Sequence, residues 1–410
     1  MNAELLIRPS LNDHRVVADL LAATVPGVSR PVSRLVLNAQ DAARQPEFAE
    51  IAAKSGTAVL IDPLTVLLQS EVAPSDAWVK SVSFGRADAL SDAELANPFF
   101  IDLLVAQALE FQVDHGATAI VPPYFYAKRP DSPAFGASLT AISRMAKRMR
   151  AEGVSLPLAP VLCAQLRSFL HRRDWQLVLD RFAAAAVDVG PQAVGMYFSP
   201  IGSSRDDNYA KVRHLVDAGR HLASYGVPTF AWRQGFYGPA LVAAGLSGYE
   251  TGLGVGERSD IASYQSQHKP KKSQGGGGSA GVYIAALGRS VDPKLARVLL
   301  GSRQTMGRMV CNDVRCCPHG SESMLKSNRP HAARARAREL EELSAIPNEA
   351  WRLHHIARQA GGAHVLATKA NELAAAAGLA ERVPVKGYES LEQVAEDLRT
   401  QSAASARDSA

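Results

Sequence analysis

Three of the four cysteines of this 410-residue chain fall within one short stretch, at Cys311, Cys316 and Cys317, and His319 and His331 follow them. Thiolate sulfur and imidazole nitrogen are the ligands that tetrahedral zinc prefers. We therefore predict a zinc site that uses the three cysteines, with His331 or His319 as the fourth ligand. Four protein ligands leave no open position on the metal, which indicates a structural role. The alternative is one reactive or buried cysteine with incidental neighbours.

A carboxylate at the end of a predicted strand is the second candidate for a functional residue. Asp62 ends the apolar run Ala58-Val-Leu-Ile61 and precedes a proline that stops the strand. Such a carboxylate can act as a nucleophile or a general base. The alternative is a turn or helix N-cap aspartate before the segment that begins at Leu64.

A glycine-rich strand end is the third candidate. Gly252, Gly254 and Gly256 let the backbone approach a ligand closely and expose peptide groups to it. Glu257 follows where a carboxylate can accept from the N–H donors of a heterocycle. The alternative is that these glycines only form a turn.

Eight short apolar or β-branched runs alternate along the chain with amphipathic, helix-like segments. These predicted elements must position the candidate residues named above. The runs cover residues 33–40, 57–63, 118–126, 156–165, 193–200, 227–235, 249–256 and 281–288. This alternation indicates parallel β/α units, and both the count and the length fit a closed (β/α)8 barrel of the TIM type. An open doubly wound sheet explains seven of the eight runs equally well.

In a β/α barrel the active site lies at the C-terminal ends of the strands. The polar residues predicted there form a ring that suits recognition of a flat polar molecule: Asn38, Gln40, Asp62, Tyr124, Tyr126, Gln165, Ser199, Arg233, Gln234, Glu250, Glu257 and Arg289.

The predicted organisation is a barrel over residues 1–300, a cysteine-rich zinc segment with an arginine-rich helix over 301–345, a helical extension over 346–395 and a disordered tail over 396–410. Residues 64–100 form a long strand-to-helix connection, which in a barrel belongs to the functional face. Residues 258–280 contain four consecutive glycines and the basic run Lys269-Pro-Lys271-Lys272, which predict a flexible loop or lid.

The composition is that of a soluble globular protein, with 47% hydrophobic and 21% charged residues. The N-terminus lacks the layout of a signal peptide and no apolar run is long enough to span a bilayer, so we expect a cytoplasmic protein without membrane contact. The formal net charge of +5 allows an anionic partner without requiring one.

The order of these features resembles the tRNA-guanine transglycosylase superfamily, which includes 7-deazaguanine DNA transglycosylases. The resemblance rests on Asp62, on Gln234-Gly235, on Gly252-Leu253-Gly254-Val255-Gly256-Glu257 and on the cysteine segment that follows. It implies a β/α barrel with a zinc site near the C-terminus. It also implies that Gln234, the 252–256 backbone and Glu257 recognise a guanine or deazaguanine base.

The same resemblance implies a pair of catalytic aspartates. Asp62 corresponds to the first, and Asp313 is the candidate for the second, with Asp260 as another. A carboxylate would then attack the anomeric carbon of a guanosine and displace guanine, as retaining glycosidases displace their leaving groups. The sequence departs from the family at Asp62-Pro-Leu-Thr65, where the family has Asp-Ser-Gly-Gly, and in its Cys-x4-Cys-Cys spacing.

We therefore expect exchange or recognition of a guanine-type base in tRNA or DNA, with a homodimer as an open alternative. The basic loop and Arg334, Arg336 and Arg338 would contact phosphates, unless these arginines pair with Glu339, Glu341 and Glu342. Two other functions stay open: a non-catalytic nucleic-acid-binding member of a modification or defence system, and an unrelated barrel enzyme that acts on a small metabolite.

Overall fold

A sheet of seven parallel strands forms the centre of the molecule. The computed structural model describes residues 3–11, 13–22, 32–70, 76–202, 207–254, 257–267 and 280–408. The strands are β1 (Glu4–Arg8), β2 (Arg34–Asn38), β3 (Ala58–Asp62), β4 (Val161–Gln165), β5 (Val194–Ser199), β6 (Thr229–Ala231) and β7 (Gly248–Gly252). Their spatial order is β3-β2-β1-β7-β6-β5-β4, and every pair is parallel.

An extended segment at residues 118–121 closes this sheet into a barrel. Parallel bridges join Ala119 to Leu60 of β3 and Ile120 to Leu158, just before β4. The seven strands and this segment together occupy eight strand positions around the barrel, which confirms the predicted (β/α)8 barrel. The two prolines that follow, at 122 and 123, lack the N–H donors that a longer strand needs.

Two strands differ from the sequence prediction. β1 was not predicted as a strand, yet it lies between β2 and β7 and completes the ring. The predicted eighth strand, residues 281–288, is only β8 (Val282–Ile284), which pairs antiparallel with β9 (Arg289–Val291) in a separate sheet. The turn η2 (Ala285–Leu287) and Gly288, whose φ is 59°, reverse the chain between β8 and β9. The sequence prediction that residues 281–288 form a barrel strand was therefore wrong.

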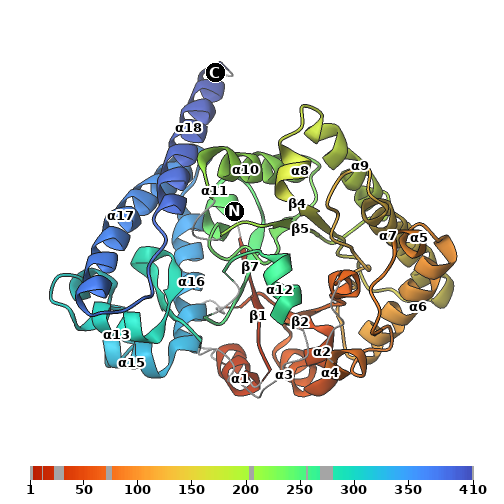
Figure 1. The fold of residues 1–410 in the computed structure, drawn as a ribbon, viewed down its shortest axis with the longest axis horizontal. Helices are drawn as coiled ribbons and strands as arrows, with labels where there is room; N and C mark the ends of the chain where they lie inside the picture. Colours follow the sequence, from red (N-terminus) through yellow and green to blue (C-terminus); the bar gives the residue numbers. More distant parts are fainter. Residues whose placement is uncertain are drawn as a thin grey trace.

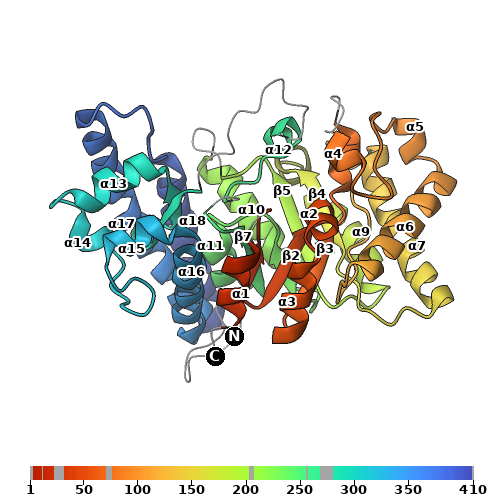
Figure 2. The ribbon, with the colours of Figure 1, turned by 90° about the horizontal axis from the view of Figure 1, so that it is seen from below.

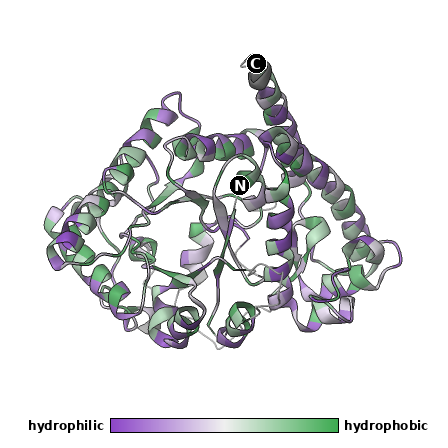
Figure 3. Ribbon diagram, turned by 180° about the vertical axis from the view of Figure 1, so that it is seen from behind, coloured by the Kyte–Doolittle hydropathy of each residue, from purple (hydrophilic) through white to green (hydrophobic). Residues whose placement is uncertain are grey.

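A ring of helices surrounds the barrel (Figure 1). These are α1 (His14–Ala22), α3 (Glu47–Ser55), α6 (Pro98–Asp114), α7 (Pro133–Glu152), α9 (Trp175–Val187), α10 (Tyr209–Ala223) and α11 (Gly238–Ala243). Their boundaries follow local chemistry: Asn97 caps α6 by accepting from the N–H of Phe99, and Gly153 ends α7 with a left-handed φ of 69°. The helices carry alternating hydrophobic and hydrophilic bands, as expected for one buried face (Figure 3).

Short elements lie in the connections that follow several strand ends, and some of them cover one end of the barrel. They are α2 (Ala39–Arg44), η1 (Thr65–Gln69), α4 (Asp76–Val79), α5 (Asp92–Leu95), α8 (Leu166–Leu170) and α12 (Ile261–Gln267). Helix α12 lies across the carboxyl ends of the strands (Figures 1 and 2). Its first residue, Ile261, is buried among the side chains that fill the barrel, and Gln265 donates to the carbonyl of Val66 in η1. We call this end the barrel mouth.

The C-terminal part forms a helical layer on one side of the barrel. It contains α13 (Pro293–Gly301), α14 (Met306–Met309), α15 (Ser321–Lys326), α16 (Asn328–Ala345), α17 (Glu349–Ala376) and α18 (Lys386–Asp408). Helices α17 and α18 pack along each other, and α18 also contacts α10.

The predicted disordered tail was wrong for residues 396–408, which continue helix α18. Alanine is the strongest helix former, and three alanines fall at positions 403, 404 and 406. The side chain of Gln401 accepts from Arg213 at 2.9 Å, and Ser402 donates to Glu349 at 3.1 Å. These contacts attach this part of the helix to α10 and α17.

The strands alternate between two hydrophobic cores. Leu6, Val36 and Leu60 point into the barrel, whereas Leu5 and Ile7 pack against the surrounding helices. Among the described residues, no helix combines the length and the apolar character needed to cross a membrane.

Candidate functional site at the barrel mouth and candidate metal centre

A buried cluster of charged side chains occupies the barrel mouth, with Arg8 of β1 at its centre. Its guanidinium group contacts Asp62 at 2.8 Å, Glu250 of β7 at 2.5 and 2.9 Å, and Asn38 at 2.6 Å. Arg8, Asp62 and Glu250 are 7%, 0% and 1% exposed. Burial and the charge of Arg233 act to lower the pKa of Arg8, but the two carboxylates more than offset them, so its pKa is raised. The cation is therefore permanent.

Asp62 has all its acceptor positions occupied. It accepts from the N–H of Leu64 at 2.9 Å, from the hydroxyl of Tyr124 at 2.7 Å and from the indole of Trp232 at 3.3 Å, besides its ion pair with Arg8. Burial, followed by the charge of Asp62, raises the pKa of Tyr124, which keeps its hydroxyl a donor. Asp62 thus forms the predicted turn with Leu64 and at the same time belongs to the charged cluster.

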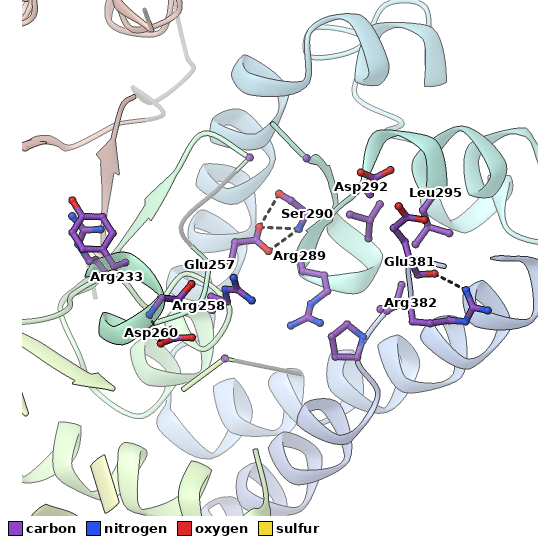
Figure 4. Close-up of a pocket in the computed structure, with 18 of the residues that line it drawn as sticks. Arg233, Glu257, Arg258, Asp260, Arg289, Ser290, Asp292, Leu295, Glu381 and Arg382 are labelled. Carbon is purple, nitrogen blue, oxygen red and sulfur yellow. Dashed lines mark hydrogen bonds between the residues drawn. The ribbon is translucent and has the colours of Figure 1, made fainter. Parts of the chain in front are cut away.

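An open cavity of about 620 Å³ lies beside this cluster, between the barrel mouth and the helical extension. Figure 4 shows its side chains, which come from the end of β7, from α12, from β9 and from the segment before α18. The lining includes four arginines and four acids: Arg233, Arg258, Arg289, Arg382, Glu257, Asp260, Asp292 and Glu381. Tyr197 and Tyr264 add aromatic surface. Asp62 does not line it.

Two of the residues predicted to bind a base reach this cavity. Gly254 lines it with a φ of 79°, and a Cβ atom there would approach the carbonyl oxygen of Gly281 to 2.6 Å, so only glycine fits. Glu257 lines it as well, but its carboxylate accepts from the N–H and the hydroxyl of Ser290 at 2.8 Å and from Arg336 at 2.5 Å.

The remaining residues predicted to bind a base lie behind the cavity wall or outside the described residues. Gln234 is 1% exposed and donates to the carbonyl of Met196 at 3.1 Å, while its own carbonyl oxygen has no partner among the described residues. Gly252 is buried at the end of β7, opposite Arg8 in the sheet. Gly256 and the basic loop at 269–272 fall outside the described residues.

The two candidates for a second catalytic aspartate lie in different places. Asp260 lines the cavity and accepts from the N–H of Ser263 at the start of α12. Asp313 lies in the cysteine segment, where it contacts Arg315 and Arg338 at 3.3 and 3.2 Å. None of its hydrogen bonds or ion pairs within the described ranges reaches the barrel mouth. The structure therefore does not bring Asp313 together with Asp62.

The cysteine segment brings four metal-binding side chains together. The ligand atoms of Cys311, Cys316, Cys317 and His331 all lie within 4.8 Å of one another. The two sulfur atoms of Cys316 and Cys317 are 3.8 Å apart, and each lies 3.3–3.4 Å from Nδ1 of His331. A tetrahedron with Zn–S bonds of about 2.3 Å has S···S edges of roughly 3.8 Å. The group can therefore hold a metal ion, and the fourth ligand is His331 rather than the exposed His319.

The surroundings of this group orient its ligands. Nε2 of His331 lies 2.9 Å from the carbonyl oxygen of Tyr283 in β8, which can only accept a hydrogen bond. The proton of the neutral imidazole is thereby placed on Nε2, and Nδ1 is free to bind a metal. The carbonyl of Asp313 accepts from the N–H groups of Cys316 and Cys317 in a tight turn. That turn lets two adjacent cysteines face one point.

Sequence reasoning missed two residues of the mouth, Arg8 and Tyr264. Arg8 lies on the strand that was not predicted, although the run Leu5-Leu-Ile7 followed by Arg8 and a proline has the form of a short strand with a polar end. The guanidinium group of Arg233 lies over the ring of Tyr264 at 4.3 Å. Arg336 was expected to contact phosphates or the glutamates of its own helix, but it is buried and pairs with Glu257.

No protein-family model and no curated protein matches the sequence. Among solved structures, a deoxyribose phosphate aldolase from Aeropyrum pernix is similar at 12% identity and a TM-score of 0.35, over 65% of this chain and 91% of the aldolase. Orotidine 5′-monophosphate decarboxylase from Methanocaldococcus jannaschii follows at 9% identity and a TM-score of 0.33, over 65% of this chain and all of that one. The carboxyl transferase domain of Rhizobium etli pyruvate carboxylase has 12% identity and a TM-score of 0.36, over 98% of this chain and 62% of that one. At these levels the likenesses carry no argument about activity, and the chain is described by its own geometry as a (β/α)8 barrel with a Cys3His group.

Proposed function

We propose that this chain is a transglycosylase-like barrel that binds a guanine-type base in the mouth cavity. The observation that supports this most is that Gly254 and Glu257, two of the residues on which the family resemblance rests, line one cavity together with Tyr264. Its volume of about 620 Å³ lies within the range of small-molecule sites, about 300–1,000 Å³. An aromatic ring beside backbone and carboxylate acceptors suits a flat heterocycle with N–H donors.

The geometry favours recognition of the base over its exchange. A nucleophilic carboxylate needs an oxygen that can reach the anomeric carbon of the substrate. Both oxygens of Asp62 are hydrogen-bonded, the residue is 0% exposed, and Asp62 lies outside the cavity lining. We therefore assign Asp62 to the support of the mouth, through Arg8 and Tyr124, and not to attack on a sugar.

Zinc is the metal that the Cys3His donor set would take, because three thiolates and one imidazole form a closed tetrahedral set. A site of this kind would be structural. It would connect the cysteine segment to α16, which carries His331, and through Tyr283 to β8.

Calorimetric titration with guanine and 7-deazaguanine tests the binding proposal. We expect saturable binding, and we expect Tyr264→Leu to weaken it about tenfold or more, since stacking on an aromatic ring contributes about 1–3 kcal/mol per base. Tyr225→Leu is the matched control, because Tyr225 lies on the outer surface, next to Asp180. Equal affinity of the two variants, or no binding by the wild type, would overturn the proposal.

Incorporation of radiolabelled guanine into tRNA or duplex DNA tests recognition against exchange. We expect no incorporation above the protein-free background for either the wild type or Asp62→Asn. Incorporation by the wild type that Asp62→Asn abolishes would show that Asp62 is catalytic and that the assignment above is wrong.

A further inference from the structure

Arg289 occupies an unusual position in the wall of the mouth cavity. It is the first residue of β9 and is only 7% exposed. Its guanidinium group lies over the ring of Phe236 at 4.2 Å and near the ring of Tyr388 at 5.4 Å. These two rings hold the side chain in place. Figure 4 shows the group between Glu257 and Arg258 on one side and Glu381 and Arg382 on the other.

The other buried arginines show what Arg289 lacks. Arg8 and Arg336 each form a close ion pair with a buried or half-buried carboxylate. Arg352 donates to the carbonyl oxygens of Ala243 and Ile346. Within the described ranges, Arg289 has no ion pair and no side-chain hydrogen bond, and its buried Nε atom has no acceptor.

The acids of the cavity do not supply the missing partner. Glu257 is already neutralised by Arg336 and held by Ser290. Asp260 and Asp292 accept from backbone N–H groups at the starts of α12 and α13. Four arginines and four acids line the cavity, so their numbers balance, but Arg336 approaches Glu257 from outside the lining. The cavity is therefore left with an excess positive charge. Arg233 donates to Asn38 and lies near the charges of Glu250 and Asp62. Arg289 is the most deeply buried arginine of the lining and has no such acid close to it within the described part of the chain.

A buried cation without a counter-charge is costly, because it has lost its hydration, and the two cation–π contacts of Arg289 replace only part of it. The cost is removed when a bound anion supplies the acceptors. The planar guanidinium group presents two parallel donors, which match the oxygens of a phosphate better than those of a single hydroxyl. The neighbouring Arg258, which is exposed, can add a second contact from the rim.

We propose that Arg289 binds a phosphate group of the ligand in the mouth cavity, so that the ligand is a phosphorylated guanine-type nucleoside or a phosphate-bearing stretch of nucleic acid. The choice of guanine rests on the proposed function above. The phosphate site itself rests only on the burial, the packing and the missing partner of Arg289.

The test compares guanosine, guanosine 5′-monophosphate and inorganic pyrophosphate as calorimetric titrants of the full-length protein. For the wild type we expect the monophosphate to bind at least about tenfold more tightly than guanosine, as one charge-assisted contact provides. Arg289→Met keeps the packing on the two rings and should remove this difference, whereas Arg289→Lys should retain part of it. Arg297→Met, on the exposed face of α13, is the matched control and should leave the difference unchanged.

Thermal unfolding provides a second readout that does not depend on the base. We expect pyrophosphate to raise the melting temperature of the wild type and of Arg297→Met, but not that of Arg289→Met. In the absence of any anion, Arg289→Met should melt at or above the wild-type temperature, since it removes an uncompensated buried charge. A clear destabilisation of Arg289→Met without anion would overturn the proposal, because it would reveal a partner inside the protein.

The results of these titrations distinguish the proposed phosphate site from the proposed guanine site. Pyrophosphate binding that depends on Arg289, without binding of guanosine, would support the phosphate site and contradict the guanine assignment. Equal affinities for guanosine and its monophosphate would overturn the phosphate site and leave the base site standing. A single-stranded RNA trinucleotide with a central guanine distinguishes the two sources of phosphate, because tighter binding than that of the monophosphate assigns the site to nucleic acid.

Discussion

Arg8, Asp62 and Glu250 depend on one another at the barrel mouth, because each is buried and each neutralises a neighbour. Replacement of such a network by apolar groups is often nearly neutral, whereas removal of one member leaves a buried charge without a partner. The three side chains therefore stabilise the fold only as a complete set. We expect one substitution to lower the free energy of unfolding more than three substitutions together.

Arg8→Met should lower the free energy of unfolding by about 3–5 kcal/mol, because it leaves two carboxylates buried and close together. Urea unfolding followed by circular dichroism measures this loss. The triple variant Arg8→Met, Asp62→Asn, Glu250→Gln should recover a large part of the stability. A triple variant no more stable than Arg8→Met would show that the charges do not act as one network.

Glu339 is a further residue whose charge state affects the stability of the fold. It is half-buried on α16. One carboxylate oxygen accepts from the hydroxyl of Tyr283 at 2.6 Å, and the other is buried and has no partner among the described residues. Burial raises the pKa of Glu339 from the ordinary value of 4.5 to about 7. The folded protein therefore holds this proton more tightly than the unfolded chain does. Its contribution to stability is complete below about pH 4.5 and is lost as the pH rises through about 7.

Glu339→Gln imitates the protonated side chain and should remove this pH dependence. The variant should exceed the wild type in free energy of unfolding by about 3 kcal/mol at pH 8 and by almost nothing at pH 4. Urea titrations at both pH values give the comparison, with the exposed Glu341→Gln as the control. A stability difference that is the same at both pH values would contradict the raised pKa.

At the scale of elements, the metal group joins three parts of the extension. Cys311 follows α14, Cys316 and Cys317 precede α15, and His331 belongs to α16. The segment between α14 and α15 contains no regular element, so its conformation depends on what holds the four side chains together. A bound ion would supply that restraint.

Cys316→Ser should reduce the bound zinc from about one ion per chain to nearly none, as measured by plasma mass spectrometry of the purified protein. Cys163→Ser is the matched control, because Cys163 is buried inside the barrel, away from the group. We expect the control to keep its metal. A wild type that folds fully and contains no metal would refute the metal site.

Closure of the barrel depends on a close approach of β7 to β1. A Cβ atom on Gly248 would lie 2.2 Å from the carbonyl oxygen of Glu4 and 2.9 Å from the ring of Phe230. Gly248→Ala should therefore lower the free energy of unfolding by about 1–3 kcal/mol or more, as overpacking does. Gly301→Ala has open space around it and should be neutral or slightly stabilising. Thermal unfolding of the two variants and the wild type provides the comparison. Equal stabilities of the two variants would argue against the observed register of β1 and β7.

The sequence predicts an element reliably only when the element is long enough to show a hydrophobic periodicity. The long amphipathic helices and the Val- and Leu-rich strands at 34–38 and 58–62 have clear periodicities, and the barrel could be predicted from them. The run of β1 has the form of a short strand but is too short to require one, and β8 has the apolar character of a barrel strand although it pairs elsewhere. Pairing between distant segments decides both cases, and a local pattern does not contain it.

At the scale of the whole molecule, the mouth cavity is built by the barrel and the extension together. The barrel contributes the end of β7 and Arg233, while β9 and the segment at 381–384 contribute the opposite wall. Glu257 and Gly254 could be predicted as site residues from the glycine-rich run. That Arg336 of α16 would neutralise Glu257, and that Arg289 would have no partner among the described residues, depends on how the two parts pack, which one sequence does not reveal.

We propose that a guanine-type base binds in this cavity and not at the Asp62 cluster. A crystal structure of the full chain grown with guanosine 5′-monophosphate tests it most directly. We expect density for the base between Gly254 and the ring of Tyr264, with the phosphate within hydrogen-bond distance of Arg289. Nucleotide density at any other place, or an ordered but empty cavity in the presence of saturating nucleotide, would contradict it.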